Sequence, residues 1–569
     1  MNRPALVPVQ PVARRNVWAT NGGIYFGLQT EPPADPDRPL AGRDSSMRAQ
    51  TDPRTFWKPS GDENAYTADR HVITIGPNGS GKTRKLLLPN VFRLREWSKV
   101  LIDPKGEICA HTAPYLASIP GHKVVVVDPF GVMQSPQYAK LYAKHGDILQ
   151  SRGFNPLAAL DAKSPRMIDG AKAIAEALIK IDDARDPYWP QAAQALCKGI
   201  IIALVIARDV KLMKLPEADE RELQATLEKI NEEAQAQGRP PVSAEMVEKQ
   251  RQLKTARLQK VLDEDKADLA TFRRIIGLSP DELARWCKLR VGCFGREFSA
   301  LGPSIGRYAD YKPDNRELSA VLGTAMVQTD WLDSPEIQAD LLGEPFDFGS
   351  LKTTPTSVFF ILPPEFLGSH SVWLRLMVSA ALRPLLRSVE TGERTVPVLF
   401  MLDEFAQLGY MKIIEDNYAL LRGYGVKLWT IWQDLTQAKN LYKDRWESFM
   451  SNAGIRQTFA PQDLTTRDYL ARMSDKRQKW HTTESSSVGL ALKSLPSLNM
   501  SSGETRLDDA VFHPHELSAL DLDEAVLWDR MMQYHLSVTP QPELLTTPFP
   551  GAGESVSALM AQARAAIDG

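Results

Sequence analysis

The chain has 569 residues, of which 43% are hydrophobic and 24% charged, so it is long enough for two or three globular domains. Its formal net charge of −2 excludes a uniformly basic nucleic-acid-binding surface, although a local basic patch remains possible. The four cysteines form no C-x-x-C pair, which excludes a disulfide scaffold and favours a reducing compartment.

We find no signal for targeting or membrane insertion in the sequence. The first forty residues are rich in proline and lack the apolar core of a signal peptide. The longest apolar run, 199–207, is far shorter than the roughly 20 residues that a membrane span needs. We therefore expect a soluble, cytoplasmic protein.

The order of predicted elements indicates an α/β fold. Residues 1–69 are punctuated by prolines and look weakly ordered, although 21–28 could add an extended segment to a sheet edge. In 70–185, helix-like stretches separate short β-branched runs at 71–75, 100–103 and 124–128. Continuous apolar runs of this length are typical of strands buried on both faces of a mainly parallel sheet.

A helical insertion is predicted to interrupt this sheet. Residues 186–320 carry apolar residues at helical spacing and no strand-like alternation, which predicts an inserted all-α domain. Its charged helices at 217–266 suit either a partner surface or a solvent-facing hairpin. Strands resume within 321–480, at 357–362, 398–404, 427–432 and 455–460. In 481–569 we expect a C-terminal segment with a polar tail, after a mobile Ser/Thr-rich loop over 480–506.

A glycine-rich motif at 76–83 predicts a phosphate-binding loop. It matches G-x-x-x-x-G-K-[ST] between an apolar strand and a helix start, a context that argues against a simple glycine turn with a surface lysine. Glycines let successive N–H groups point at phosphate oxygens, while Lys82 reaches the β- and γ-phosphates of ATP and Thr83 ligates Mg²⁺. The predicted binding residues are Gly76, Pro77, Asn78, Gly79, Ser80, Gly81, Lys82 and Thr83.

The second acidic element of such a site follows the strand at 398–404. That strand ends in Asp403 and Glu404. We expect Asp403 to hold Mg²⁺ or its water shell, and Glu404 to orient and deprotonate the attacking water. A plain helix cap at Asp403 is the alternative, and the presence of the phosphate loop argues against it.

Two further residues are candidates on position alone. Gln433 ends the strand at 427–432, where an amide could contact the γ-phosphate or the attacking water; an exposed strand-end glutamine is the alternative. Arg422 precedes that strand and could reach a neighbouring subunit's nucleotide in a ring, or lie simply at the surface.

Taken together, these motifs resemble the type IV secretion coupling proteins, the TraG/TraD-like ATPases of conjugative DNA transfer. The resemblance rests on GPNGSGKT, LIDPKGE (101–107), VVVVDPFG (124–131) and FNPL (154–157), then LDEFAQLG (402–409), RGYG (422–425) and WQDLTQAKNLY (432–442). It extends from about residue 66 to 475 and is poor beyond. Asp103 and Lys105 match a segment near the nucleotide, without an assigned chemical step.

The resemblance implies a RecA-like core, a homo-hexameric ring and an ATPase that couples cargo to a type IV secretion channel. The implied cargo is single-stranded DNA bound to a relaxase, or an effector protein, recognised by the helical insertion. Family members commonly begin with transmembrane helices, which we do not find. The chain is therefore expected at the cytoplasmic face of the inner membrane, with a separate membrane partner as one route of attachment.

Other interpretations remain for comparison. A docking platform could bind nucleotide without hydrolysing it, although an intact Lys82 and Glu404 argue against this. An ABC transporter subunit would need an LSGGQ-like segment, which the sequence lacks. HPHE (513–516) has no third ligand at metal-site spacing, so we interpret it as a loop. The basic, aromatic stretch 467–481 suits either a solvated helix face or a contact to the DNA backbone.

Overall fold

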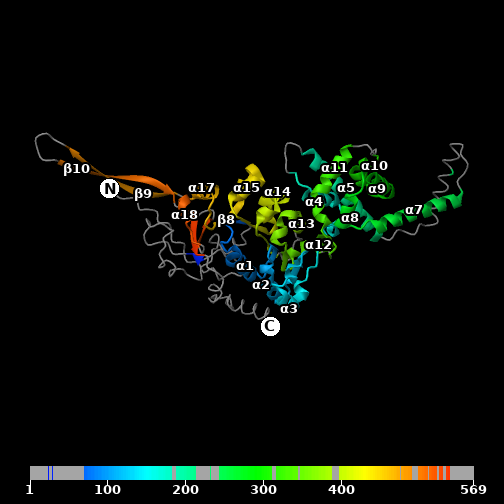
Figure 1. Ribbon diagram of the computed structural model, residues 1–569, viewed down its shortest axis with the longest axis horizontal. Helices are drawn as coiled ribbons and strands as arrows, with labels where there is room; N and C mark the ends of the chain where they lie inside the picture. The colour runs from blue at the N-terminus through cyan, green and yellow to red at the C-terminus, as the bar shows by residue number, and fades with distance from the viewer. Residues whose placement is uncertain are drawn as a thin grey trace.

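The molecule is elongated, with a sheet-centred body between a group of helices at one end and a two-stranded ribbon at the other (Figure 1). The computed structural model describes residues 24, 28–29, 70–181, 187–212, 231, 243–310, 316–343, 346–386, 396–474, 476–489, 497–510, 512–521, 524–528 and 533–537.

The body is built on a ten-stranded sheet whose strand order is β1-β12-β11-β8-β2-β7-β6-β3-β5-β4. The strands from β8 to β4 in this order run parallel to one another, as their buried apolar runs predict. These parallel strands are β2 (His71–Ile75), β3 (Ser98–Ile102), β4 (Lys123–Val127), β5 (Thr356–Phe360), β6 (Val398–Leu402), β7 (Val426–Trp432) and β8 (Ala453–Thr458).

An antiparallel extension continues the sheet beyond β8. There β11 (Glu524–Trp528) pairs with β8, β12 (Gln533–Ser537) pairs with β11, and β1 (Leu28–Gln29) pairs with β12. Of the edge segment expected at 21–28, Leu28 lies in β1, whereas residues 21–23 and 25–27 lie outside the described residues. The expectation of only a loop and tail after 481 is wrong, because β11 supplies buried residues such as Val526 and Leu527 to the core.

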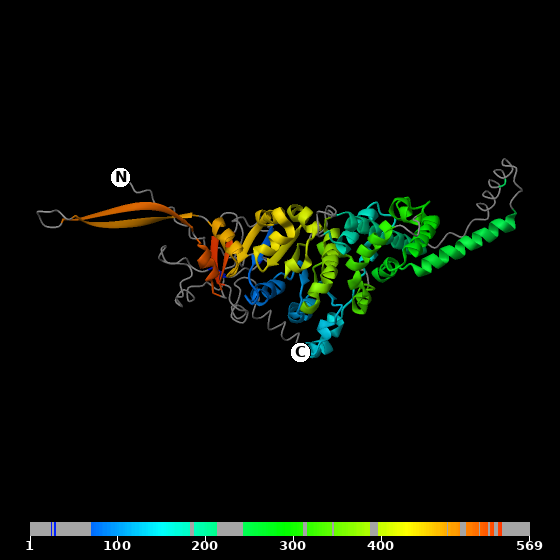
Figure 2. The same ribbon diagram turned by 45° about the horizontal axis from the view of Figure 1, so that its top comes forward.

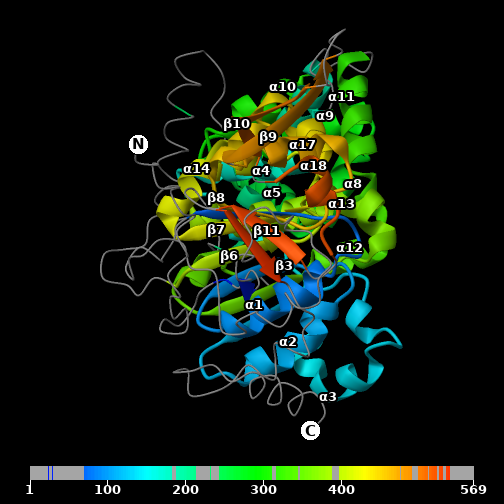
Figure 3. The same ribbon diagram turned by 90° about the vertical axis from the view of Figure 1, so that its left-hand side faces the viewer.

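Helices cover both faces of the sheet because neighbouring strand residues alternate between two cores. Val72 and Leu101 belong to one apolar cluster, whereas Ile73 and Val100 belong to the other. Figure 3 shows the two helical layers on either side of the strands. The first layer contains α1 (Leu88–Arg93), α2 (Glu107–Ser118) and α3 (Ala139–Leu149); the second contains α13 (Leu367–Leu385), α14 (Lys412–Leu421), α15 (Leu435–Tyr442) and α16 (Trp446–Asn452).

Between β4 and β5 the chain leaves the sheet and forms the helical end of the molecule, seen in Figure 1. The helices extend beyond 186–320 on both sides, since α4 and α11 both contact α5. They are α4 (Met167–Leu178), α5 (Tyr188–Leu212), α7 (Ala244–Glu264), α8 (Leu269–Ile276), α9 (Pro280–Phe294), α10 (Arg307–Ala309), α11 (Arg316–Gln328) and α12 (Pro335–Asp340).

Helix α5 is longer than its apolar run suggested. Residues 188–211 are long and apolar enough to cross a bilayer, the one such helix in the described part of the chain. Most of that apolar stretch is buried inside the protein, with Ile200 to Ala207 fully enclosed, so the apolar surface is used in the helical core.

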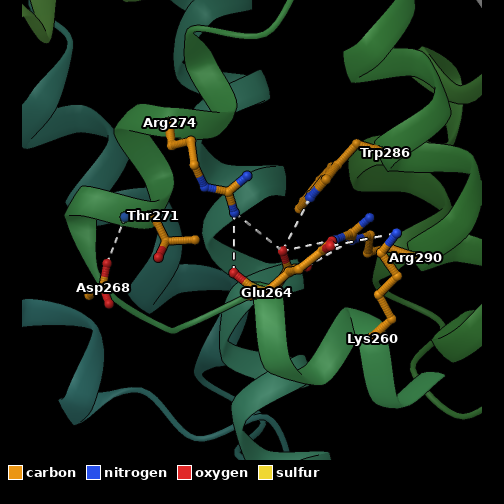
Figure 4. Close-up of polar contacts among 8 residues, drawn as sticks. Lys260, Glu264, Asp268, Thr271, Arg274, Trp286 and Arg290 are labelled. Atoms are coloured by element: carbon orange, nitrogen blue, oxygen red, sulfur yellow. Dashed lines mark hydrogen bonds and ion pairs between the residues drawn. The ribbon is translucent and has the colours of Figure 1, made fainter. Parts of the chain in front are cut away.

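A buried ion pair fixes the direction of the long helix α7 where it leaves the helical core (Figure 4). Asp265, directly after α7, accepts hydrogen bonds from Arg290 Nε at 2.7 Å and Arg290 Nη2 at 2.8 Å. Arg290 also stacks on Trp286, and Arg274 contacts the same carboxylate at 3.9 Å. This bidentate geometry on two enclosed side chains compensates the cost of removing both charges from water.

The segment expected to be a mobile loop forms a two-stranded ribbon instead. Strands β9 (Lys476–Gly489) and β10 (Ser497–Ala510) pair antiparallel after helix α17 (Leu464–Met473), and the chain then enters α18 (Pro514–Ser518). Ser/Thr-rich composition does not by itself indicate a loop, because threonine favours strands. HPHE is likewise not a loop: His513 and Glu516 form the capping box of α18.

Candidate nucleotide site

All the predicted site residues except Arg422 meet at the carboxyl ends of three adjacent strands. β7 lies between β2 and β6, so the glycine-rich loop after β2, Gln433 after β7 and Asp403-Glu404 after β6 leave the same end of the sheet. Two backbone hydrogen bonds hold this edge together: Gly76 N donates to Trp432 O at 2.9 Å, and Phe459 N donates to Ile75 O at 2.9 Å. The loop at 76–83 and the residues 403–404 therefore lie together at the same end of the sheet.

The loop adopts a curled backbone that its glycines make possible. Gly79 and Gly81 have φ of 82° and 77°, which side-chain-bearing residues rarely adopt. A Cβ on Gly81 would also lie 2.8 Å from Lys85 Cε, and Lys85 Nζ donates to Ser80 O at 3.1 Å. The chain continues into a π-helix over Thr83–Leu87 before α1, the kind of irregular turn that is frequent at functional sites.

Lys82 is enclosed by the loop that it belongs to. Its Nζ donates to Gly76 O at 2.8 Å and to Pro77 O at 3.0 Å. Burial lowers the pKa of Lys82, and the opposite charges of Asp403 and Glu404 partly counter that effect. The ammonium is thus held where the curled N–H groups converge, next to the two acidic residues.

Thr83 and Asp403 form an oxygen pair suited to a divalent cation. Thr83 Oγ1 donates to Asp403 Oδ2 at 3.4 Å, although the residues are 320 positions apart. Burial raises the pKa of Asp403 to about 6, against the lowering effects of Lys82 and Thr83. A bound cation would offset this cost of a buried carboxylate.

The oxygen pair of Thr83 and Asp403 suits Mg²⁺ bound together with nucleotide phosphates better than a metal ion bound by protein ligands alone. Among the described residues, no group of three or more His, Cys, Asp or Glu side chains could hold a metal ion. Mg²⁺ is commonly bound by one or two protein oxygens together with substrate phosphates and water. The hydroxyl of Thr83 and the carboxylate of Asp403 match that mode.

Glu404 is held in a strained conformation and contacts Gln433. Its φ of 57° and ψ of 45° place a non-glycine residue in the left-handed region, where strain is common at active sites. Gln433 Nε2 donates to Glu404 Oε2 at 2.8 Å, and Gln407 N donates to Glu404 O at 2.8 Å. The amide that the sequence placed at a strand end therefore orients the predicted general base.

Arg422 lies far from these residues within the same subunit. It precedes β7, whereas Gln433 follows that strand, so the two residues lie at opposite ends of the same strand. Seven residues of strand separate them by roughly 20 Å. Arg422 is exposed there. This position excludes a role at its own nucleotide site and leaves a neighbouring subunit or the surface.

The structure also gives Asp103 a structural task that the sequence did not supply. Asp103 Oδ2 accepts a hydrogen bond from Cys109 N at 2.7 Å, at the start of α2. Burial raises the pKa of Asp103 to about 7, with a further contribution from the charge of Asp403. On the same helix, Glu107 pairs with Arg84 at 2.7 Å, so α2 supports the helix that follows the phosphate loop.

The sequence did not reveal a contact between the segment after Glu404 and the helical region. Arg375 of α13 is buried and donates from Nε at 2.9 Å and Nη2 at 2.7 Å to Ala177 O, near the end of α4. Gly409, one short turn beyond Glu404, lies beside it: a Cβ there would be 3.6 Å from Arg375 Nη1 and 3.5 Å from Lys180 Nζ. In the sequence, the one hint of this close approach is that LDEFAQLG ends in a glycine, Gly409.

Comparison with known proteins gives a consistent result. The family model described as "Type IV secretory system Conjugative DNA transfer" matches residues 41–530. The conjugal transfer protein TraG of Rhizobium radiobacter is 23% identical over 467 residues, covering 80% of this chain and 60% of the relative. TraG of Escherichia coli is 24% identical over 424 residues, covering 72% and 55%. The chain thus spans little more than half the length of these relatives.

Solved structures of a coupling protein share the fold. The unbound bacterial conjugative coupling protein TrwBdeltaN70 aligns with a TM-score of 0.52 at 13% identity, covering 84% of this chain and 86% of that one. TrwB in complex with ADP and Mg²⁺ aligns with a TM-score of 0.50 at 11% identity, covering 91% and 95%. The likeness confirms the RecA-like α/β core, and the family match past residue 475 corrects the expectation of poor similarity there.

Proposed function

Since the chain belongs to the type IV secretory system family of conjugative DNA-transfer proteins, we propose that it is an ATP-hydrolysing coupling protein of such a system. The observation that carries this proposal is the convergence of Lys82, Thr83, Asp403, Glu404 and Gln433 at one sheet edge. TrwB, which shares the fold, has been solved with an ATP analogue and with ADP and Mg²⁺, which supports ATP and Mg²⁺ as the ligands here.

Each residue has a defined task in this proposal. The loop N–H groups and Lys82 bind the phosphates, and Thr83 with Asp403 would hold Mg²⁺, which when bound neutralises charge on the β- and γ-phosphates. Glu404 accepts a proton from the attacking water, while Gln433 fixes the carboxylate through the 2.8 Å hydrogen bond. Positioning of this kind supplies most of the catalysis in phosphoryl transfer.

Hydrolysis in this proposal is completed between subunits. Arg422 cannot reach its own site, so it serves the nucleotide of a neighbour in a homo-hexameric ring, where it stabilises the charge that develops on the γ-phosphate. The ring works at the cytoplasmic face of the inner membrane, in contact with the secretion channel and, as one route of attachment, with a separate membrane partner.

The proposed cargo is inferred from family membership, because the nucleotide site carries no information about it. The proposed substrate is single-stranded DNA joined to a relaxase, received by the helical region between α4 and α12. An effector protein would use the same chemistry, and the two cargoes differ in what the helical region binds. Arg375 connects that region, through Ala177 O, to Gly409 in the segment after Glu404.

ATP turnover by the purified chain, measured with and without single-stranded DNA, tests the proposal. We expect turnover that DNA increases, and that Lys82→Ala abolishes because the phosphates lose their buried cation. Lys140→Ala, at an exposed position of α3 outside both the nucleotide site and the helical region, is the matched control and should leave turnover unchanged. No turnover under any condition, with nucleotide still bound, would favour the docking platform; stimulation by effector protein but not by DNA would favour the alternative cargo.

A further inference from the structure

The ribbon of β9 and β10 is a separate small sheet. Its strands pair in continuous register from Lys476↔Ala510 to Gly489↔Ser497, and neither strand pairs with any other strand that the structure describes. Figures 1 and 2 both show it standing away from the body, at the end opposite to the helical region.

A two-stranded ribbon leaves the backbone hydrogen-bonding groups on its two outer edges without a partner strand. Each strand has 14 residues and spans about 45 Å. A lone two-stranded hairpin is only marginally stable in water, and its two outer edges present rows of backbone donors and acceptors that are templates for further pairing. A third strand on either edge would satisfy these groups and stabilise the ribbon.

The sequence of the ribbon indicates which strand could pair with its outer edges. β9 starts with a basic group, Lys476, Arg477 and Lys479, and β10 ends with the acidic pair Asp508 and Asp509. Both groups lie at the same end of the ribbon, because Arg477 is the register partner of Asp509. At this end of the ribbon, β9 is therefore the strand with the basic group and β10 the strand with the acidic pair.

We propose that β9 of one copy of this chain pairs edge to edge with β10 of the next copy. Hairpins that point the same way around a ring alternate in strand direction, so each new pair is antiparallel, like the pair inside one hairpin. The contact joins two different edges, and a contact of this head-to-tail type closes into a ring when the rotations between neighbouring copies add up to a full turn. Opposite charges at the base favour this pairing over β9 with β9 or β10 with β10.

This inference rests on the ring in the proposed function and deepens it. A ring of roughly six copies would close about twelve strands into a barrel, which at 4.8 Å spacing and a tilt near 40° is roughly 24 Å across between strand axes. After side chains are allowed for, about 14 Å remains, which is enough for an extended single strand of nucleic acid. The ribbons would thus form a collar at one mouth of the ring.

Cysteine cross-linking between two tagged forms of the full chain tests the proposal. One form carries Arg477→Cys, and the other carries cysteine at Thr505, Leu507 or Asp509 in turn, because barrel closure shifts the register by a few residues. Cys293→Ser in both forms removes the partly exposed native thiol. We expect mixed disulfide dimers for at least one of these pairs. The matched control, Arg477→Cys with Ser497→Cys at the far end, should give none.

Charge reversal supplies a second readout. A chain with Arg477→Asp and Lys479→Asp has two acidic edges, and a chain with Asp508→Lys and Asp509→Lys has two basic edges. Each alone should elute as smaller species than the native chain, and an equal mixture should restore the larger assembly. Unchanged assembly of both variants, or cross-links between two Arg477→Cys chains, would overturn the proposal. Cross-links without ATP turnover would count against the proposed function alone, and turnover without cross-links against the ribbon contact alone.

Discussion

The hydrogen bond between Gln433 and Glu404 makes the sharpest prediction for catalysis. Gln433→Leu keeps the side-chain size but removes the donor that lies 2.8 Å from Glu404 Oε2. A hydrogen bond to a charged group contributes about 1.5–3 kcal/mol. If that energy positions the base in the transition state, turnover should fall roughly 10- to 150-fold.

Nucleotide affinity should respond differently, because the phosphates are held by Lys82 and the loop. We expect the Kd for ATP, measured by fluorescent-nucleotide titration, to change by less than about 3-fold, while single-turnover hydrolysis slows by the full amount. Gln407→Leu is the matched control: it is an exposed glutamine one turn beyond Glu404 and should leave both quantities unchanged.

A double-mutant cycle separates positioning from general damage. In a Glu404→Gln background, Gln433→Leu should have little further effect on hydrolysis, since the base that it orients is already lost. Independent, multiplicative losses in the cycle, or a weakening of ATP binding as large as the loss of turnover, would refute this role for Gln433.

Four further predictions follow from other contacts. Glu404→Gln should bind ATP but not cleave it, so intact ATP should be recovered from the complex; ADP in the complex would contradict the assignment of the base. Mixing Arg422→Ala with Lys82→Ala subunits should restore some turnover, because one interface then holds both intact residues; no rescue at any ratio would count against action across a boundary. Arg375→Met should reduce stimulation by DNA at least several-fold while basal turnover persists. Arg456→Met, which removes hydrogen bonds to Met450 O and Ala453 O outside the helical region, is the control and should lower the melting temperature but keep the stimulation ratio; equal ratios in both variants would contradict the link to α4. Burial raises the pKa of Asp340 to about 7 from 3.8, so the protonated carboxyl contributes at most about 4 kcal/mol to the free energy of unfolding. This contribution is fully present below pH 4 and is lost as the pH rises through 7. Asp340→Asn should therefore lose less stability than the native chain between pH 5 and pH 8 in urea unfolding, and an equal loss in both proteins would contradict the prediction.

The parallel core of the sheet was predictable because its signals are local. Buried runs such as 71–75 and 427–432 are apolar throughout, and the phosphate loop and Asp403-Glu404 directly follow such runs. Parallel strands place their carboxyl ends at one edge, so the meeting of Thr83 with Asp403 followed from topology. The contact between Gln433 and Glu404 needed only one further assumption, that β7 lies beside β6.

The features that the sequence did not predict depend on contacts between residues distant in sequence. β11 enters the sheet through pairing with β8, and the bond from Arg375 to Ala177 joins residues 198 positions apart. The ribbon was mistaken for a loop because β9 and β10 have no apolar alternation that marks a half-buried strand. Helix α5 was judged by its apolar run alone, whereas flanking residues such as Ala193 and Leu196 extend its buried surface.

The central claim, that the glycine-rich loop and the acidic strand end share one nucleotide–metal site, is tested most directly by the Mg²⁺ dependence of ATP affinity. The Kd should be measured with and without Mg²⁺ for the native chain, Thr83→Ala, Asp403→Asn and the double variant. We predict that each single variant loses most of the strengthening by Mg²⁺ and that the double variant loses no more than either, because both oxygens hold the same ion. Strengthening by Mg²⁺ that survives in Asp403→Asn would contradict the claim.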